Sequence, residues 1–188
     1  MKIVCIAWGS LLWKAAPMIL ASGWQAGGPM LPLEFARDSD DSEELAIVIA
    51  DGAALMPTYW ALMETGNLEE AREQLRQREK VSVEHPEWIG SVPAMEGQQT
   101  DPRMASWLSH QPFDAVIWTA LPPKFNGIEG RAPSAEEALT FLSLLTGPTR
   151  DKAEEYIRRI PADIMTPYRK RFEEALSWTA LPVLQDPA

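Results

Sequence analysis

The chain has 188 residues, of which 46% are hydrophobic and 23% charged, and its formal net charge is -10. This length and composition are typical of one globular domain with a sizeable core, and they exclude a disordered chain. The negative charge argues against a nucleic-acid surface, because phosphate recognition requires a basic patch. We therefore expect no nucleic acid among the partners.

The sequence also argues against a membrane protein. No apolar stretch approaches the roughly 18 residues of a membrane-spanning helix. The N-terminal segment is partly apolar, but Lys14 and Pro17 interrupt it, so it does not match a signal peptide. Cys5 is the single cysteine and lies in an apolar run, so no disulfide can form within the chain. We expect a cytoplasmic protein that binds no membrane.

Strands are predicted in the first third of the chain. Residues 3–7 are apolar and rich in β-branched side chains, which is typical of a buried strand. Residues 31–37 and 45–50 predict the two arms of a hairpin, joined by a turn at residues 38–42. Residues 58–63 predict a further strand.

One helix, one long loop and one strand are predicted next. Asn67 is a suitable N-cap for a helix that runs to about Glu79. Residues 84–111 contain five Pro or Gly breaks and little periodicity, which indicates a long loop of the kind that often forms a lid or a binding loop. Residues 115–121 predict the last strand, which Pro122 and Pro123 end.

The remainder is predicted to be helical. Ser134 and Glu137 form a capping box for a first helix, which Gly147 and Pro148 are expected to end. A second helix stops at Pro161, and a third begins at the Thr166 cap. This order predicts an α+β fold with a mixed sheet or small β-barrel, flanking helices and a C-terminal three-helix cover.

The turn after the first strand is one candidate site. Trp8, Gly9, Ser10, Leu11 and Leu12 follow the strand directly. Gly9 permits a sharp turn, which can aim backbone N–H groups at one point and so bind a small anion. An ordinary turn at the end of a strand is the alternative.

Glu79 is the second candidate. Leu68 and Leu75 mark the apolar stripe of the predicted helix, and Glu79 falls about 20° from the first and about 40° from the second. Burial and the negative end of the helix dipole would both raise the pKa of its carboxyl group. Glu79 is therefore either a buried base or, if the helix ends one residue earlier, a solvated end residue.

The sequence supports a functional role less strongly for the other candidate residues. Arg37 either pairs with a substrate carboxylate or is solvated at the end of its strand, and Trp118 lines a pocket or packs in the core. His85 and His110 have no carboxylate at ligand spacing, so we expect no metal.

The turn and the end of the helix together resemble the γ-glutamylcyclotransferase-like superfamily. Ala7-Trp8-Gly9-Ser10-Leu11-Leu12-Trp13 is similar to its N-terminal signature, with Trp8 in place of the usual tyrosine. Leu75-Arg76-Gln77-Arg78-Glu79-Lys80 is similar to the helix end that carries its catalytic glutamate, although Arg76 and Lys80 depart from the usual residues.

The resemblance implies a γ-glutamylcyclotransferase-like fold and a cofactor-independent enzyme. The resemblance covers a core at residues 1–125 and does not extend to the C-terminal helices. Since the length indicates one domain over residues 1–188, residues 126–188 are expected to form a helical cover on that core. Glu79 would be the general base, and Trp8 to Leu12 would bind the substrate, with Arg37 and Trp118 as possible pocket residues. The substrate would be a γ-glutamyl amine or peptide, cyclised to 5-oxoproline with release of the amine.

Two alternatives remain open. The first is a small-ligand-binding or interaction protein that keeps the fold without turnover, which the Trp8 replacement and the extra helices favour. The second is a hydrolase that uses Ser10 as nucleophile, although no Gly-x-Ser-x-Gly elbow surrounds this residue.

Overall fold

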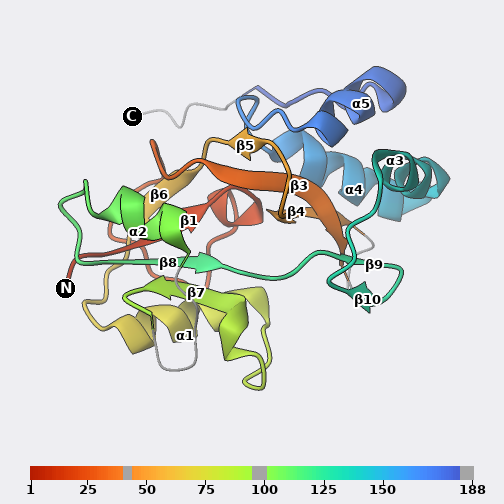
Figure 1. Ribbon diagram of the computed structural model, residues 1–188. Coiled ribbons are helices and arrows are strands. Elements are labelled where there is room, and N and C mark those ends of the chain that lie inside the picture. Colours follow the sequence, from red (N-terminus) through yellow and green to blue (C-terminus); the bar gives the residue numbers. More distant parts are fainter. Residues whose placement is uncertain (40–43, 95–100, 183–188) are drawn as a thin grey trace. The chain divides into compact units, whose positions relative to one another are not determined.

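The computed structural model of the chain describes residues 1–39, 44–94 and 101–182, which form two compact units. The first unit comprises residues 1–31 and 57–121, and the second comprises residues 32–56 and 122–188. Each unit contains one mixed sheet and helices, so the predicted α+β class is confirmed (Figure 1). In the described residues both sheets are open, as a mixed sheet predicts, rather than closed into a barrel. The prediction of a single domain stays a prediction.

The sheet of the first unit has the strand order β2-β6-β1-β8-β7. β1 lies at its centre, parallel to β8 and antiparallel to β6. The strands are β1 (Ile3–Ala7), β2 (Gln25–Ala26), β6 (Tyr59–Leu62), β7 (Ile89–Val92) and β8 (Ala115–Thr119), and the helical segments are η1 (Ser10–Leu12), α1 (Leu68–Glu79), η2 (Pro86–Trp88) and α2 (Pro102–Leu108).

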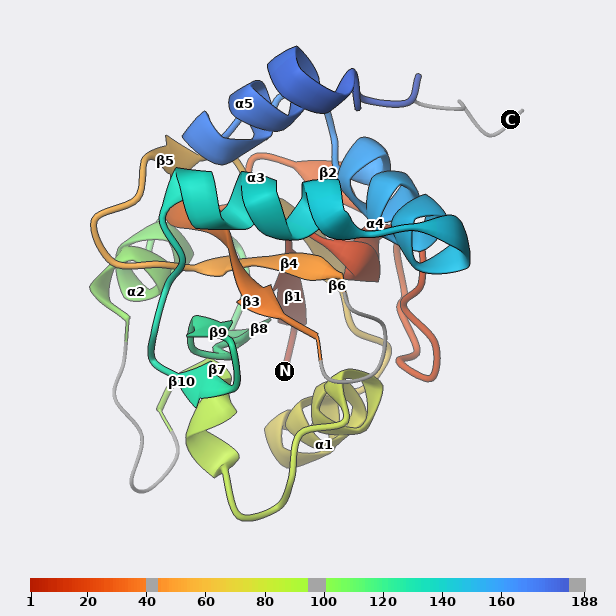
Figure 2. The same cartoon turned by 90° about the vertical axis from the view of Figure 1, so that its right-hand side faces the viewer.

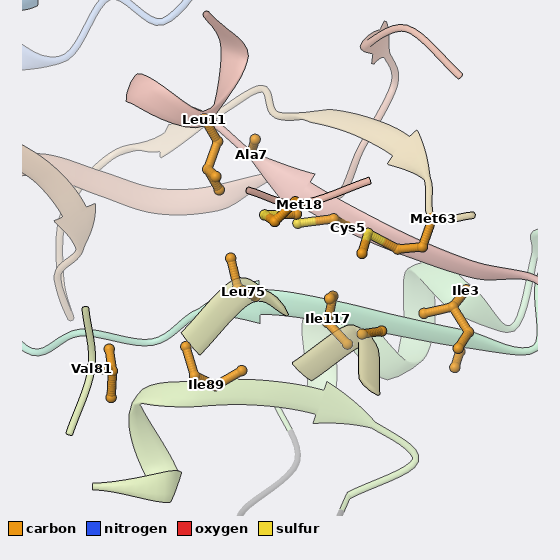
Figure 3. Close-up of a cluster of buried hydrophobic side chains, with 12 residues drawn as sticks. Ile3, Cys5, Ala7, Leu11, Met18, Met63, Leu75, Val81, Ile89 and Ile117 are labelled. Carbon is orange, nitrogen blue, oxygen red and sulfur yellow. The ribbon is translucent and has the colours of Figure 1, made fainter. Parts of the chain in front are cut away.

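The apolar stripe of α1 packs on one face of this sheet. Every second residue of β1 points to that face, and Ile3, Cys5 and Ala7 are each at most 1% exposed. Ala71 and Leu75 of α1 are completely buried in the same cluster, and Figure 3 shows Leu75 beside Ile117 and Ile89. The alternate residues of the strand and the apolar stripe of the helix thus form one core, as the sequence predicts.

The boundaries of α1 are those predicted. The Asn67 side chain accepts hydrogen bonds from the N–H groups of Glu69 and Glu70. The helix continues through Glu79, and Lys80 takes a left-handed conformation with φ 54° as its C-cap. The alternative in which the helix ends before Glu79 is therefore wrong.

The prediction of a loop over residues 84–111 is wrong for residues 84–94 and 101–111, which contain η2, β7 and α2, and residues 95–100 lie outside the described residues. Gly90 is an interior residue of β7, opposite Trp118, and a Cβ atom at this position would lie 2.1 Å from Cε2 of the indole. The glycine therefore makes room for a close contact rather than breaking the strand. Pro102 similarly occupies the first turn of α2, directly after the N-cap Asp101.

The sheet of the second unit has the order β10-β9-β3-β4, with β5 also paired to β3. The predicted hairpin is confirmed, since β3 and β4 are antiparallel. Helices α3 to α5 gather beside these strands (Figure 2). The strands are β3 (Leu31–Asp38), β4 (Leu45–Ile49), β5 (Leu55–Met56), β9 (Lys124–Phe125) and β10 (Ile128–Glu129), and the helices are α3 (Ala135–Leu144), α4 (Gly147–Arg159) and α5 (Pro167–Leu176). Part of the predicted turn at residues 38–42 lies outside the described residues.

Three helices follow the last strands, as predicted, but one boundary differs. The capping box of Ser134 and Glu137 begins α3, and Thr166 caps α5. Gly147 and Pro148 begin α4 instead of ending α3, because proline has no N–H to lose in a first turn and its fixed φ suits that position. In the described residues no helix has both the length and the apolar character needed to cross a membrane.

We predict that Gly90→Ala lowers the free energy of unfolding by about 1–3 kcal/mol, because the added methyl group must displace the Trp118 indole. Urea denaturation measures the change. Gly23→Ala is the control, since a Cβ atom at Gly23 meets nothing within 4 Å. Equal stability of the two variants would contradict the prediction.

Candidate active site

The turn after β1 is a short 3-10 helix whose first N–H groups are unused. The Leu12 N–H donates to the Gly9 carbonyl at 3.0 Å, and the Lys14 N–H donates to the Ser10 carbonyl at 2.9 Å. The N–H groups of Ser10 and Leu11 have no acceptor among the described residues. Such groups are suited to binding negative charge.

The side chains of this turn differ in where they lie. Leu11 is 5% exposed and belongs to the cluster beneath α1 (Figure 3). Leu12 is partly buried and packs against that cluster. Trp8 is also buried, at 5% exposure. Leu11, predicted to bind substrate, would therefore do so through its backbone N–H while its side chain anchors the turn. The N–H of Leu12, the other leucine predicted to bind substrate, is already used by the Gly9 carbonyl.

Arg78 connects this turn to Glu79. Its Nη2 donates to Oγ of Ser10 at 2.8 Å, and its Nε donates to the carbonyl of Lys14 at 2.8 Å. Its Nη1 lies 3.4 Å from Oε1 of Glu79. The structure thus brings together two predicted site residues, Ser10 and Glu79, through a third that sequence reasoning missed.

Glu79 is a buried carboxylate, with its side chain 14% exposed. Burial raises the pKa of this carboxyl group, and the positive charge of Arg78 opposes the rise. The Thr119 hydroxyl also lowers the pKa, although its buried Oγ1 makes no hydrogen bond of ordinary geometry within the described part of the chain. Burial also raises the pKa of the Cys5 thiol, and the nearby negative charge of Glu79 raises it further.

Trp118 does not lie beside Glu79. Ile117 belongs to the cluster beneath α1, and neighbouring residues of a strand point to opposite faces. Trp118 therefore points away from α1, where it is 3% exposed and packs over Gly90, whereas Thr119 points to the face that carries Glu79. Thr119 is thus a further site residue that sequence reasoning missed.

Arg37 belongs to the second unit and is not solvated there. It is 8% exposed, and its two terminal nitrogens contact the Glu129 carboxylate at 2.7 and 3.0 Å. Its Nη1 also donates to the carbonyl of Pro122 at 2.8 Å. The expectation of a solvated strand-end arginine is wrong, because this side chain is held inside its unit by a bidentate ion pair.

Neither histidine contacts Ser10. The His85 ring stacks on Trp88 with ring centroids 4.0 Å apart, and Nδ1 of His110 lies 2.8 Å from the Ser106 carbonyl. The Ser10 hydroxyl accepts from Arg78, which cannot act as a base at neutral pH. Nothing in this arrangement supports a serine hydrolase. In the described residues no three His, Cys, Asp or Glu side chains form a group that could hold a metal ion.

No protein-family model and no curated protein matches the sequence. Among solved structures, the chain is similar to a selenomethionine-labelled γ-glutamyl cyclotransferase specific to glutathione from yeast, with 12% identity and a TM-score of 0.45 over 98% of this chain and 91% of that one. A second structure of such a yeast enzyme gives 12% identity and a TM-score of 0.47 over 94% and 98%.

The raised pKa of Glu79 predicts a pH-dependent gain in stability for Glu79→Gln. The unfolded carboxyl ionises near 4.5, while the folded one holds its proton to higher pH. Between these two pKa values the folded state binds more protons, so the wild-type chain loses stability as pH rises, by up to about 1.4 kcal/mol per pH unit.

The difference in the free energy of unfolding, variant minus wild type, should therefore increase from pH 4.5 upward. Urea denaturation at several pH values measures it, with Glu69→Gln as the control because Glu69 is exposed on the same helix. A difference that stays constant or falls with pH would contradict the prediction.

Proposed function

We propose that this chain is a γ-glutamylcyclotransferase-like enzyme, with Glu79 as general base and the turn from Trp8 to Leu12 as substrate cradle. The observation that carries the proposal is the link from the buried Glu79 carboxylate, through Arg78, to Ser10. It supports a site in which a base with a raised pKa stands at a fixed position relative to unused backbone donors.

The reaction needs only one base and a set of donors. The α-amine of the γ-glutamyl substrate gives a proton to Glu79, and its nitrogen attacks the γ-carbonyl carbon of the same molecule. Negative charge on the substrate is bound by the N–H groups of Gly9, Ser10 and Leu11. The new C–N bond closes the five-membered ring, the old C–N bond breaks, and Glu79 returns the proton to the departing amine.

A raised pKa suits Glu79 to this task. A free α-amine has a pKa of about 8, and a carboxylate with an ordinary pKa is too weak a base to accept its proton efficiently. Burial of the Glu79 side chain at the end of α1 moves its pKa towards that of the amine. Because the nucleophile is tethered to its target, the protein contributes mainly a fixed geometry and a proton acceptor.

We predict that the protein converts at least one γ-glutamyl peptide or γ-glutamyl amine to 5-oxoproline, and that Glu79→Gln abolishes this conversion. A mixed panel is incubated with the protein, and 5-oxoproline is measured by mass spectrometry. Gln keeps the size of the side chain but cannot accept the proton, so kcat should fall by about 10²-fold or more. Glu69→Gln should retain wild-type turnover.

Each result of this experiment has a distinct meaning. Product that persists in Glu79→Gln would show that another group is the base. No product from any member of the panel would contradict the proposed activity. It would favour a protein that binds a small ligand without turnover, an alternative that the buried Trp8 in place of the usual tyrosine supports.

We further predict that turnover rises with pH along an acid limb whose midpoint lies above 4.5, the ordinary pKa of glutamate. Only the ionised carboxylate can accept the proton, and burial delays its ionisation to higher pH. The pH dependence of kcat/KM measures this midpoint. A midpoint at or below 4.5 would exclude Glu79, in this environment, as the group that titrates.

A further inference from the structure

Arg78 has a contact that helix geometry alone does not provide. Side chains at adjacent positions of an α-helix do not face each other, yet Nη1 of Arg78 lies 3.4 Å from Oε1 of Glu79. The Arg78 side chain is held in this direction by Ser10 and Lys14, whose oxygens accept from Nη2 and Nε at 2.8 Å each. The turn after β1 thus determines where the guanidinium group stands beside Glu79.

We propose that Arg78 is a positioning residue, which holds the Glu79 carboxylate and the turn at residues 9–12 in one fixed relation. In this role the guanidinium group occupies one oxygen of Glu79 and leaves the other to accept the proton of the substrate amine. The inference rests on the proposed function and names a residue that acts through the base.

The role requires the shape of arginine as well as its charge. Three nitrogens of one rigid, planar group reach three different acceptors: a hydroxyl, a main-chain carbonyl and a carboxylate. Lysine carries a single ammonium group on a flexible stem and cannot span the same three positions. The side chain is also 12% exposed, so its charge is only partly screened by water.

The charged and titratable groups that face the Glu79 carboxyl can be named element by element. In the described residues α1 contributes Arg78, and β1 contributes the Cys5 thiol. β8 contributes the uncharged Thr119 hydroxyl, and η1 contributes Ser10, whose hydroxyl is bonded to Arg78. Arg78 is therefore the cation that favours the ionised form of Glu79 against burial.

Two substitutions separate the geometry from the charge. Arg78→Met removes both, whereas Arg78→Lys keeps the positive charge without the three-way contact. Arg76→Met is the control for loss of an arginine from the same turn of α1, because Arg76 pairs with Glu73 at 2.7 Å and donates to the Val81 carbonyl at 2.6 Å, with no hydrogen bond or ion pair to Glu79 among the described residues. Circular dichroism and urea denaturation establish that each variant is folded before turnover is compared.

We expect kcat to fall about tenfold or more in both Arg78 variants, with KM within about threefold of wild type, because a base displaced by about 1 Å acts poorly on a substrate that still binds. The acid limb of kcat/KM should move up by about one pH unit in Arg78→Met and stay in place in Arg78→Lys. Arg76→Met should match the wild type in both measurements.

A second readout does not depend on turnover. The ¹³C resonance of the Glu79 carboxyl group, assigned by its absence in Glu79→Gln, is followed against pH by NMR. We expect its midpoint to rise in Arg78→Met and to stay unchanged in Arg78→Lys and Arg76→Met. A merely structural role of Arg78 would lower stability without moving this midpoint.

The outcomes distinguish this inference from the proposed function. If the wild type turns over substrate and Arg78→Met changes neither kcat nor the NMR midpoint, the inference is overturned while the function stands. A rise in KM at unchanged kcat also overturns it, since Arg78 would then bind substrate directly. If no substrate is turned over, the proposed function fails and the positioning role with it, and the NMR midpoint then reports only whether the Arg78 charge acts on Glu79.

Discussion

The packing of α1 on the face of β1 and β8 is the constraint on which the first unit depends. Leu75 and Ala71 enter the cluster that Cys5 and Ile117 line, and this contact holds the inner side of α1 against the sheet. Glu79, one turn beyond Leu75, is carried into the same environment. The apolar contact thus provides the free energy that keeps a carboxylate where its charge is disfavoured.

Comparison of two buried carboxylates indicates which of them is available for chemistry. Glu34 in β3 of the second unit is 5% exposed, and burial raises its pKa too. It accepts a hydrogen bond from the Thr166 hydroxyl and from the N–H groups of Phe35 and Tyr168, at 2.9 and 3.3 Å for the two backbone donors. Its oxygens are occupied in joining β3 to the start of α5.

Glu79 is less fully bonded than Glu34. The described residues give it one ion pair at 3.4 Å and the nearby Thr119 hydroxyl, which makes no ordinary hydrogen bond. A buried polar atom without a hydrogen bond, such as Oγ1 of Thr119 among the described residues, costs free energy. Such costs are found at functional sites, where a bound ligand can supply the missing hydrogen bond. This contrast in bonding favours Glu79 over Glu34 as the functional group.

The features that could be predicted from the sequence depend on residues close together in the chain. The Asn67 cap and the Leu68 to Leu75 stripe defined α1 through Glu79, and the caps at Ser134 and Thr166 located two later helices, because capping and periodicity act within a few residues. Arg78, three positions after Leu75, could also have been placed beside the apolar stripe.

Contacts between residues far apart in the chain could not be predicted in this way and are seen only in the folded protein. The Ser10 to Arg78 contact, the burial of Arg37, and the strand around Gly90 all depend on pairings between segments far apart in the sequence. Local propensity carries no information about such pairings. A glycine such as Gly90 therefore predicts a chain break from the sequence, although in the structure it accommodates the Trp118 side chain. The position of Glu79 on its helix follows from local periodicity. Its neighbours on β1 and β8 follow from the pairing of these two strands, which are far apart in the sequence and come together only on folding.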